Sequence, residues 1–339
     1  MKLLTTSIIT SLIYLSAYSN PLQGDIKYTP TDNKTLAVYY TYDKKFDKDF
    51  FEFTGELESI GYYINDPHHN VNRVYEKEFG STALETLNFN SIVIDEVIRP
   101  MLNIDPRIAA FSPFNLLMYR KKSDHKTVIA HLTPEAMLDI LEITDKNVRS
   151  KFIAAYKPLD PMIEKKFGGK KSLLPLSGYA KDTMMNFEIP FEEPEDIDDY
   201  LDEFQEKFEA TFQMKGYIIA GYYNMKESPN SEDEEVLASY SSFWSYDLCH
   251  IPFSYEVFDG KNALPMAGIF APCSMYVYVK EGENKFVIGM PTLRAWAGAM
   301  GITDKHKLEK IDNLDRGITE IILGLGGKEV PNGNPLLKK

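Results

Sequence analysis

The sequence predicts an α+β protein made of two tandem copies of a small domain, each an antiparallel sheet with helices packed on one face. The main support is an internal repeat: residues 111–146 recur without a gap as residues 270–305, 159 positions later. Both copies end in the run Ile-Thr-Asp-Lys and keep apolar side chains at matching positions even where identities differ. Self-similarity at one fixed offset over so long a window indicates a duplicated unit.

Each copy also has the pattern of a β-hairpin followed by a helix. An apolar run of strand length begins just after a proline, a charged turn follows, and a second apolar run returns at 127–132 and 286–291. Two such runs around a turn predict a hairpin. Apolar residues at helical spacing then begin near Pro134 and Thr292, so a helix is expected to cover one face of each hairpin.

The same order of elements is expected upstream of the hairpins. A strand at 35–41 leads into a helix that ends at Gly61, and a strand at 184–189 leads into a helix that ends at Gly216. Glycine after the last helical residue is a stop signal. Between the shared elements, residues 65–89 and 226–260 differ most, and such variable segments are where binding loops are commonly found.

These patterns divide the chain into five parts. A further helix in each copy ends at a glycine pair, and the polar stretches after these pairs resemble connections. We therefore expect a signal peptide (1–19), a first repeat domain (25–169), a linker (170–183), a second repeat domain (184–327) and a flexible tail (328–339).

The first residues have the features of a secretory signal. Lys2 precedes a mostly apolar run, and Ala17-Tyr18-Ser19 fits a small-x-small cleavage site. Cleavage near Ser19 would leave Asn20 as the first mature residue and place the protein in the periplasm or outside the cell. The apolar run is too short to span a bilayer, and nothing later is long enough, so no membrane span is expected.

The repeat resembles a known family in its motif residues. In the first copy Asp105-Pro106 precedes a strand that opens Pro113-Phe114-Asn115, and the second copy has Pro272-Cys273-Ser274. This is similar to the domain-of-unknown-function family 302, whose pattern is a helix, an Asp-Pro and a Leu-Pro-Cys-Asn strand. Phe114 replaces the family cysteine, Ser274 replaces the asparagine, and the second copy is expected to lack the Asp-Pro helix. The resemblance implies a small α+β domain with an antiparallel sheet and helices on one side, and it implies no activity or cofactor.

Cys273 is the first candidate for chemistry, and the sequence leaves its role open. It is either a buried strand residue, matched by Phe114, or a thiolate ligand or nucleophile with His250 or Met290 as its partner. His131 matches Met290 in the other copy. Since an exported protein can keep disulfides, a bond between Cys249 and Cys273 is a further alternative.

A second candidate is His68-His69, which together with Asp66 would offer metal ligands. Adjacent histidines on a strand point to opposite faces, however, and no second pair of ligands is spaced nearby. An exposed polar loop is the competing interpretation.

The formal net charge of −13 argues against a nucleic-acid partner, because nucleic-acid binders carry basic faces. The sequence has no Gly-x-Ser-x-Gly elbow, phosphate loop or His-Glu-x-x-His. It therefore favours an exported small-ligand-binding or interaction module, with a small molecule in the cleft between the domains. The alternative is a thiol-dependent or metal-dependent enzyme centred on Cys273. Any cofactor is unknown, and self-association is left open.

Overall fold

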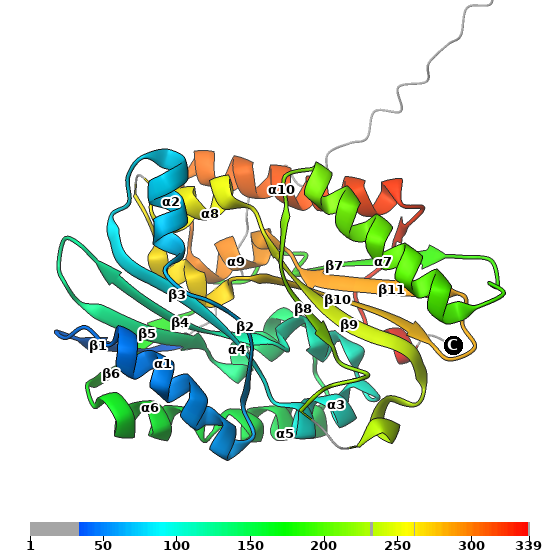
Figure 1. Cartoon of the computed structure of the whole chain (residues 1–339), viewed down its shortest axis with the longest axis horizontal. Helices are drawn as coiled ribbons and strands as arrows, with labels where there is room; N and C mark the ends of the chain where they lie inside the picture. The colour runs from blue at the N-terminus through cyan, green and yellow to red at the C-terminus, as the bar shows by residue number, and fades with distance from the viewer. Residues whose placement is uncertain (1–33, 231–232, 261, 338–339) are drawn as a thin grey trace, which may run out of the picture.

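The computed structural model describes residues 34–230, 233–260 and 262–337, and it contains two six-stranded antiparallel sheets with helices (Figure 1). The predicted α+β class is therefore confirmed. The expected signal peptide and the first residues of the first repeat domain lie outside the described residues.

The two sheets repeat one topology. The first has the order β2-β3-β4-β5-β1-β6, and the second, read from its other end, has the order β8-β9-β10-β11-β7-β12. Corresponding strands thus occupy corresponding places. Their bounds are β1 (Thr35–Tyr42), β2 (Tyr63–His68), β3 (Leu84–Val93), β4 (Phe114–Lys121), β5 (Thr127–Leu132), β6 (Lys170–Pro175), β7 (Met184–Pro190), β8 (Ile218–Asn224), β9 (Tyr240–Cys249), β10 (Cys273–Lys280), β11 (Lys285–Pro291) and β12 (Lys328–Glu329).

Helices cover the outer side of each sheet, so that both sheets lie between two helical layers (Figure 1). On the first unit these include α1 (Asp47–Glu56), α5 (Lys146–Tyr156) and α6 (Leu159–Phe167), and on the second α7 (Ile197–Met214) and α10 (Lys305–Gly324). The remaining helices are α2 (Val71–Phe79), α3 (Asp95–Leu102), α4 (Pro134–Ile140), α8 (Ile251–Phe258) and α9 (Leu293–Met300), with short 3-10 turns at η1 (Leu57–Ile60), η2 (Pro106–Phe111), η3 (Glu234–Leu237), η4 (Pro265–Phe270) and η5 (Pro335–Leu337).

Repeated caps explain why the repeated segment folds alike in both units. Thr133 accepts a hydrogen bond from the third residue beyond it at the start of α4, and Thr292 does so for α9. Asp145 and Asp304 cap α5 and α10 with their carboxylates. Such caps satisfy backbone N–H groups that a helix start leaves unpaired. The two segments accordingly adopt the same elements at the same spacing.

Each unit contributes a 3-10 turn to the inner face of the other unit's sheet. η2 packs on β10 and β11, and η4 packs on β4 and β5. The edge strands β2 and β8 also contact each other. Because these contacts are reciprocal, an approximate twofold axis relates the two units. One buried apolar cluster consequently includes residues of both.

Three expectations about the connecting segments are wrong. The expected linker contains β6, which pairs with β1, and the expected tail contains β12, which pairs with β7. Both follow a glycine pair, so the linker and the tail hold the same sixth strand of the two units. The helical turn before the second motif is also present as η4, where Leu264-Pro265 stands in place of Asp105-Pro106.

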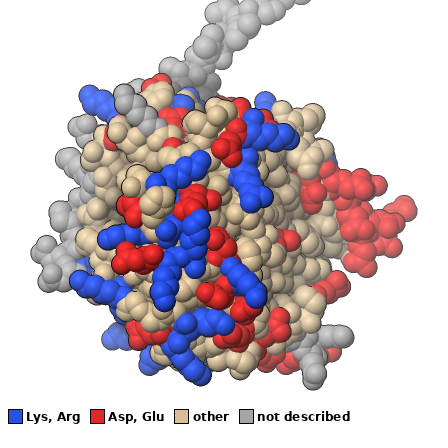
Figure 2. Space-filling model, turned by 60° about the vertical axis from the view of Figure 1, so that its left-hand side comes forward, with Lys and Arg blue, Asp and Glu red and all other residues tan. Residues whose placement is uncertain are grey.

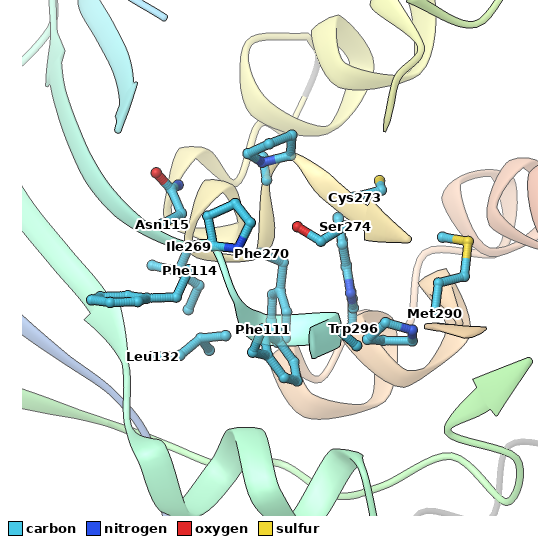
Figure 3. Close-up of a pocket in the computed structure, with 15 residues that line it drawn as sticks. Phe111, Phe114, Asn115, Leu132, Ile269, Phe270, Cys273, Ser274, Met290 and Trp296 are labelled. Atoms are coloured by element: carbon cyan, nitrogen blue, oxygen red, sulfur yellow. The ribbon is translucent and has the colours of Figure 1, made fainter. Parts of the chain in front are cut away.

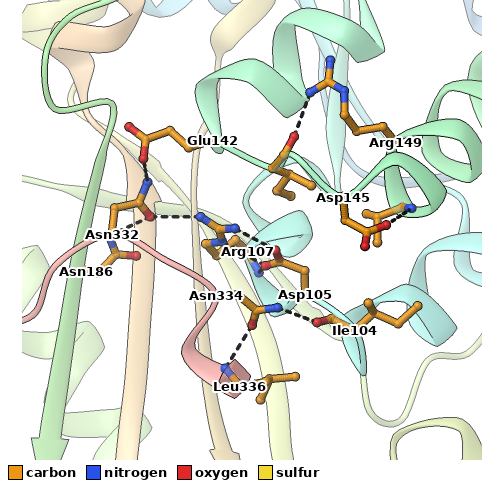
Figure 4. Close-up of polar contacts among 12 residues, drawn as sticks. Ile104, Asp105, Arg107, Glu142, Asp145, Arg149, Asn186, Asn332, Asn334 and Leu336 are labelled. Carbon is orange, nitrogen blue, oxygen red and sulfur yellow. Dashed lines mark hydrogen bonds and ion pairs between the residues drawn. The ribbon is translucent and has the colours of Figure 1, made fainter. Parts of the chain in front are cut away.

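After β12, the chain crosses to the first unit (Figure 4). Asn332 donates through Nδ2 to Glu142 Oε2 at 2.8 Å, and Asn334 donates to the Ile104 carbonyl at 2.7 Å. Arg107, which is buried and paired with Asp105 at 2.7 Å, donates to Asn332 Oδ1 at 3.5 Å. Residues 328–336, here named the C-terminal strap, therefore join the two units rather than forming a flexible tail.

The variable segments, where binding loops were expected, instead pack between the units. Phe79 of α2 stacks on Tyr255 with ring centroids 4.1 Å apart. Arg99 of α3 donates through Nε to the Met225 carbonyl at 2.8 Å, and Tyr240 donates to the Leu102 carbonyl at 2.8 Å. The inner faces of the two sheets are thus closed off by segments of both units.

The net charge is unevenly divided between the units. Residues 34–183 hold 21 basic and 21 acidic side chains, whereas residues 184–339 hold 14 basic and 27 acidic, which accounts for the whole charge of −13. One face of the molecule shows basic and acidic side chains interspersed, and acidic side chains alone gather on a projection at its edge (Figure 2).

Candidate functional site between the two units

A small cavity lies where the two copies of the repeated motif meet (Figure 3). Its volume is about 20 Å³, room for roughly one water molecule. Matching residues of the two units face it in pairs: Phe111 and Phe270, Pro113 and Pro272, Phe114 and Cys273, Asn115 and Ser274. The peptide bonds before both prolines are cis. The cavity therefore lies close to the approximate twofold axis.

The cavity is asymmetric because the second unit contributes smaller or additional side chains. Phe114 packs on Tyr156 with centroids 4.6 Å apart, but the matching residues of the second unit are Cys273 and Asp315. Met290 and Trp296 also line the cavity, whereas their counterparts in the first unit, His131 and Met137, do not. Replacing two aromatic rings by a thiol and a carboxyl leaves space on the side of the second unit.

Cys273 is half-buried at the first position of β10. Burial raises the pKa of its thiol well above the usual value, and burial raises the pKa of Cys249 to about 11. Both thiols are free. Cys273 lies opposite Leu248 in the ladder between β10 and β9. Because neighbouring strand residues alternate faces, the side chain of Cys249 lies on the other face of the sheet. The considered disulfide is therefore not formed.

Trp296 supplies an unpaired hydrogen-bond donor. Its ring stacks on Phe270 with centroids 5.1 Å apart, and 8% of the residue is exposed. The buried Nε1–H has no hydrogen-bond partner among the described residues. A buried donor without an acceptor is costly, so its presence in a cavity wall indicates a place for an acceptor.

Asp315 lies on α10, near Cys273, and its carboxylate caps the N-terminus of α9. Its carboxylate accepts from the backbone N–H groups of Leu293 and Arg294, at 2.8 and 3.1 Å. Burial raises the pKa of Asp315 to about 7, although these two hydrogen bonds lower the pKa. The sequence analysis missed this residue, although an acidic side chain at an apolar position of a helix was its signal.

The predicted ligand-binding residues fall into two groups. Cys273 and Met290 line the same cavity, and Met290 is fully buried. His250 does not line it; its Nδ1 accepts from Phe253 N at 3.3 Å and so caps α8. His131 lies in the first unit and belongs to a different polar cluster.

That cluster joins the core of the first unit to its surface. His131 Nε2 faces Asp160 Oδ1 at 3.1 Å, and Nδ1 faces the Leu132 carbonyl at 2.8 Å. Tyr40 and Lys171 donate to Asp160, both at 2.7 Å. Burial alone would raise the pKa of Asp160, but hydrogen bonds from His131, Lys171 and Tyr40 outweigh it and hold the pKa well below its usual range.

The paired histidines point to different environments. His69 stacks on Phe51 with centroids 4.0 Å apart, and its Nε2 faces Asn90 Oδ1 at 3.2 Å. The Nε2 atom of His68 is buried without a hydrogen-bond partner. Within the part of the chain that the structure describes, no three His, Cys, Asp or Glu side chains come together to hold a metal ion.

A buried carboxyl on the approximate axis was also missed. Asp247 of β9 is 2% exposed and accepts from Ser91 at 3.0 Å and from Ser274 at 2.7 Å. Its counterpart in the first unit is Ser91 itself. Asp66 approaches from β2, and both carboxyl groups converge over Gly221, where an added Cβ would meet them at 2.9 and 3.2 Å. Burial raises the pKa of Asp247 to about 6.

A wider and more open groove of about 440 Å³ lies between α3 and α5 on the first unit. Its walls are mostly apolar, with Glu96 and Lys151 at the rim. It contains none of the predicted site residues. No helix in the described ranges combines the length and apolar character that crossing a membrane requires.

No family model matches the chain, and no curated protein matches it. Among solved structures, the chain is similar to one entitled "Crystal structure of uncharacterized conserved protein DUF302 from Bacillus stearothermophilus", with 15% identity over 42% of this chain and 95% of that chain, and a TM-score of 0.29. That title names the family that the motif residues resemble, and it states no activity.

Proposed function

We propose that this protein is an exported binding protein made of two copies of one unit, and that its ligand occupies the cavity between them. One observation carries the proposal: both motif copies meet at a cavity that is lined by Trp296, whose buried N–H has no hydrogen-bond partner among the described residues, and by the half-buried Cys273. Interfaces between domains are common places for ligand sites.

The size of the cavity limits the ligand. A volume of about 20 Å³ admits one or two non-hydrogen atoms. The wall includes four aromatic side chains, and three of them are held by ring contacts: Trp296 stacks on Phe270, and Phe114 packs on Tyr156. The bound species is therefore an ion, a very small molecule, or the end group of a larger ligand.

A thiol-dependent enzyme is the less favoured alternative. A cysteine nucleophile reacts as the thiolate, which is favoured by a basic or electropositive neighbour. Burial instead raises the pKa of the Cys273 thiol, and the nearby charged groups Asp315 and Asp247 raise it further. The site thus favours holding a ligand over attacking a substrate.

Native mass spectrometry of the protein purified from its own exported fraction tests the proposal. We expect a bound ligand, seen as an added mass, in the parent protein. Cys273→Phe should lose this mass, because it puts at the cavity the phenylalanine that the first unit has at the matching position 114. Ala154→Phe, which fills the groove between α3 and α5, is the matched control and should keep the mass. Loss in Ala154→Phe alone, or no added mass in any sample, would refute the cavity as the site.

Export itself is part of the proposal. We infer cleavage near Ser19 from the Ala17-Tyr18-Ser19 pattern, with Asn20 as the mature start. N-terminal sequencing of the same preparation should return Asn20, and a sequence beginning at Met1 would contradict export. The native mass also reports whether the protein self-associates.

A further inference from the structure

Two polar side chains give the cavity wall a hydrogen-bond donor and an acceptor. Trp296 and Ser274 both line the cavity (Figure 3), and the buried Nε1–H of Trp296 has no hydrogen-bond partner among the described residues. The hydroxyl of Ser274 already donates its proton to Asp247 Oδ1 at 2.7 Å. A serine hydroxyl carries one proton and two lone pairs, so towards the cavity Ser274 acts as an acceptor.

The other polar side chain of the wall is held in place by backbone groups. Asn115, the counterpart of Ser274, accepts through Oδ1 from Asn90 N at 3.0 Å and donates through Nδ2 to the Gly268 carbonyl at 2.6 Å. The remaining side chains that line the cavity are apolar, apart from one thiol. Polar recognition of a ligand therefore falls to Trp296 and Ser274.

The charge of the ligand is restricted by the same wall. A cation has no lone pair for the N–H of Trp296, so it would leave this donor unpaired. An anion would lie near two buried carboxyl groups, because Asp247 accepts from Ser274 and Asp315 acts on the thiol of Cys273. Like charges repel more strongly in a protein interior than in water. A neutral group that both accepts and donates fits this wall.

A hydroxyl group is the smallest neutral group that accepts one hydrogen bond and donates another. A volume of about 20 Å³ admits its oxygen together with one attached carbon. Water also accepts and donates, but it carries a second O–H, which would face apolar side chains such as Phe270 and Pro272. An alcohol has carbon in that place, which suits an apolar surface.

We propose that the cavity binds the hydroxyl group of an alcohol, whose oxygen accepts from Trp296 Nε1–H and whose proton is donated to Ser274 Oγ. This assignment rests on the proposed function, since it names the ligand class of the same site. The alcohol is either a very small molecule or the end of a larger ligand. Its binding forms and breaks no covalent bond.

Methanol is the probe, at pH 7.5, which lies above the pKa of about 6 of Asp247. The chain has two tryptophans, so nitrogen-15-labelled protein gives two indole N–H signals, which Trp296→Phe assigns. We expect methanol to move the Trp296 signal downfield to a plateau. The Kd should be several millimolar or weaker, the limit for a ligand of about two non-hydrogen atoms. Trp244, which does not line the cavity, should not respond.

Two further probes separate the kinds of ligand. Methylammonium has the same number of non-hydrogen atoms as methanol but cannot accept a hydrogen bond. Formate accepts but carries a negative charge and donates nothing. Neither should move the Trp296 signal to a plateau in the concentration range in which methanol does.

Ser274 is the decisive partner. Ser274→Ala should weaken methanol binding by about threefold or more, which corresponds to the net worth of one hydrogen bond. Ser91→Ala removes the other hydroxyl that donates to Asp247, but Ser91 does not line the cavity, so the affinity should stay unchanged. Cys273→Phe should remove the response to methanol by filling the cavity. Circular dichroism and the melting temperature confirm that each variant is folded.

The absence of a saturable Trp296 shift with methanol, or an equal shift of Trp244, would overturn the assignment and leave the cavity to water. Equal affinity in Ser274→Ala and its parent, or an equal response to methylammonium or formate, would overturn it as well. In each case an added mass that Cys273→Phe removes would leave the proposed function standing, whereas absence of that mass too would refute both. Where methanol binds, the added mass tells a small alcohol from the end of a larger ligand.

Discussion

Phe114 and Cys273 occupy matching positions at the start of the central strands β4 and β10, as the sequence predicts. Phe114 is 3% exposed and packs on the rings of Tyr62 and Tyr156. Phe114→Ala should lower the free energy of unfolding by roughly 3–5 kcal/mol, because it leaves a cavity among buried rings. Urea denaturation measures this loss.

Cys273→Ala is the matched comparison, since it removes a single atom at the same place in the other unit. Its loss of unfolding free energy should be clearly smaller, because that position already borders a cavity. Equal losses in the two variants would mean that the two positions are not equivalent in packing.

Asp247 makes stability depend on pH. Its pKa is about 6 in the folded protein and near 3.9 in an unfolded chain. A carboxyl whose pKa is raised by folding favours the folded state fully below the unfolded value, and this contribution is lost as pH rises through 6. The loss between pH 4 and 7 is on the order of 3 kcal/mol. Asp247→Asn should remove it.

Urea midpoints at pH 4.5 and 7.5 measure this effect. Asp247→Asn should gain stability over the parent at pH 7.5 and show little gain at pH 4.5. Asp315, whose pKa is also raised by burial, keeps a residual pH dependence in both proteins. An identical pH dependence in variant and parent would contradict an ionising Asp247.

At the scale of the element, the C-terminal strap is held by a few polar contacts. Asn332 donates to the Glu142 carboxylate and accepts from Arg107, so it links the second sheet to the first unit. Asn332→Ala should lower the free energy of unfolding by about 1–2 kcal/mol, the usual range for hydrogen bonds to charged groups. Asn313→Ala, which removes one exposed contact on α10, should cost less than about 0.5 kcal/mol. Urea unfolding of both variants tests this, and equal effects would show that the strap adds no stability.

The sequence predicted each hairpin and the helix after it, because the signals lie within some thirty residues of one another. These signals are the two apolar strand segments, the turn between them and the residue that caps the helix. Cys273 and Met290 line the same cavity because they lie on β10 and β11, the two neighbouring strands of one hairpin. Sequence analysis failed for β6 and β12, since these strands are short and exposed, and pairing with β1 or β7 depends on contacts far away in sequence. Asp247 was missed for the same reason: its burial is created by elements that only the folded chain brings together.

The whole molecule is expected to unfold as one body. A single apolar cluster includes residues of both units, and each unit covers the inner sheet face of the other. Far-UV circular dichroism reports both units, whereas Trp244 and Trp296 both lie in the second. The two signals should therefore give coincident urea transitions. Separate midpoints would show that the units are independently stable.

Gly268 offers the sharpest test of this coupling, because it lies where η4 meets the first sheet. A Cβ there would approach Phe89 at 2.9 Å and Leu117 at 3.0 Å, both in the other unit, whereas the matching residue of the first unit is Ala109. Gly268→Ala should cost about 1–3 kcal/mol through overpacking. If the units unfold as one cooperative body, the urea midpoints from circular dichroism and from tryptophan fluorescence must shift by the same amount. This holds even though the added methyl group strains a contact between the units and touches neither tryptophan. A shift in one signal alone would show that the interface can yield while each sheet stays folded.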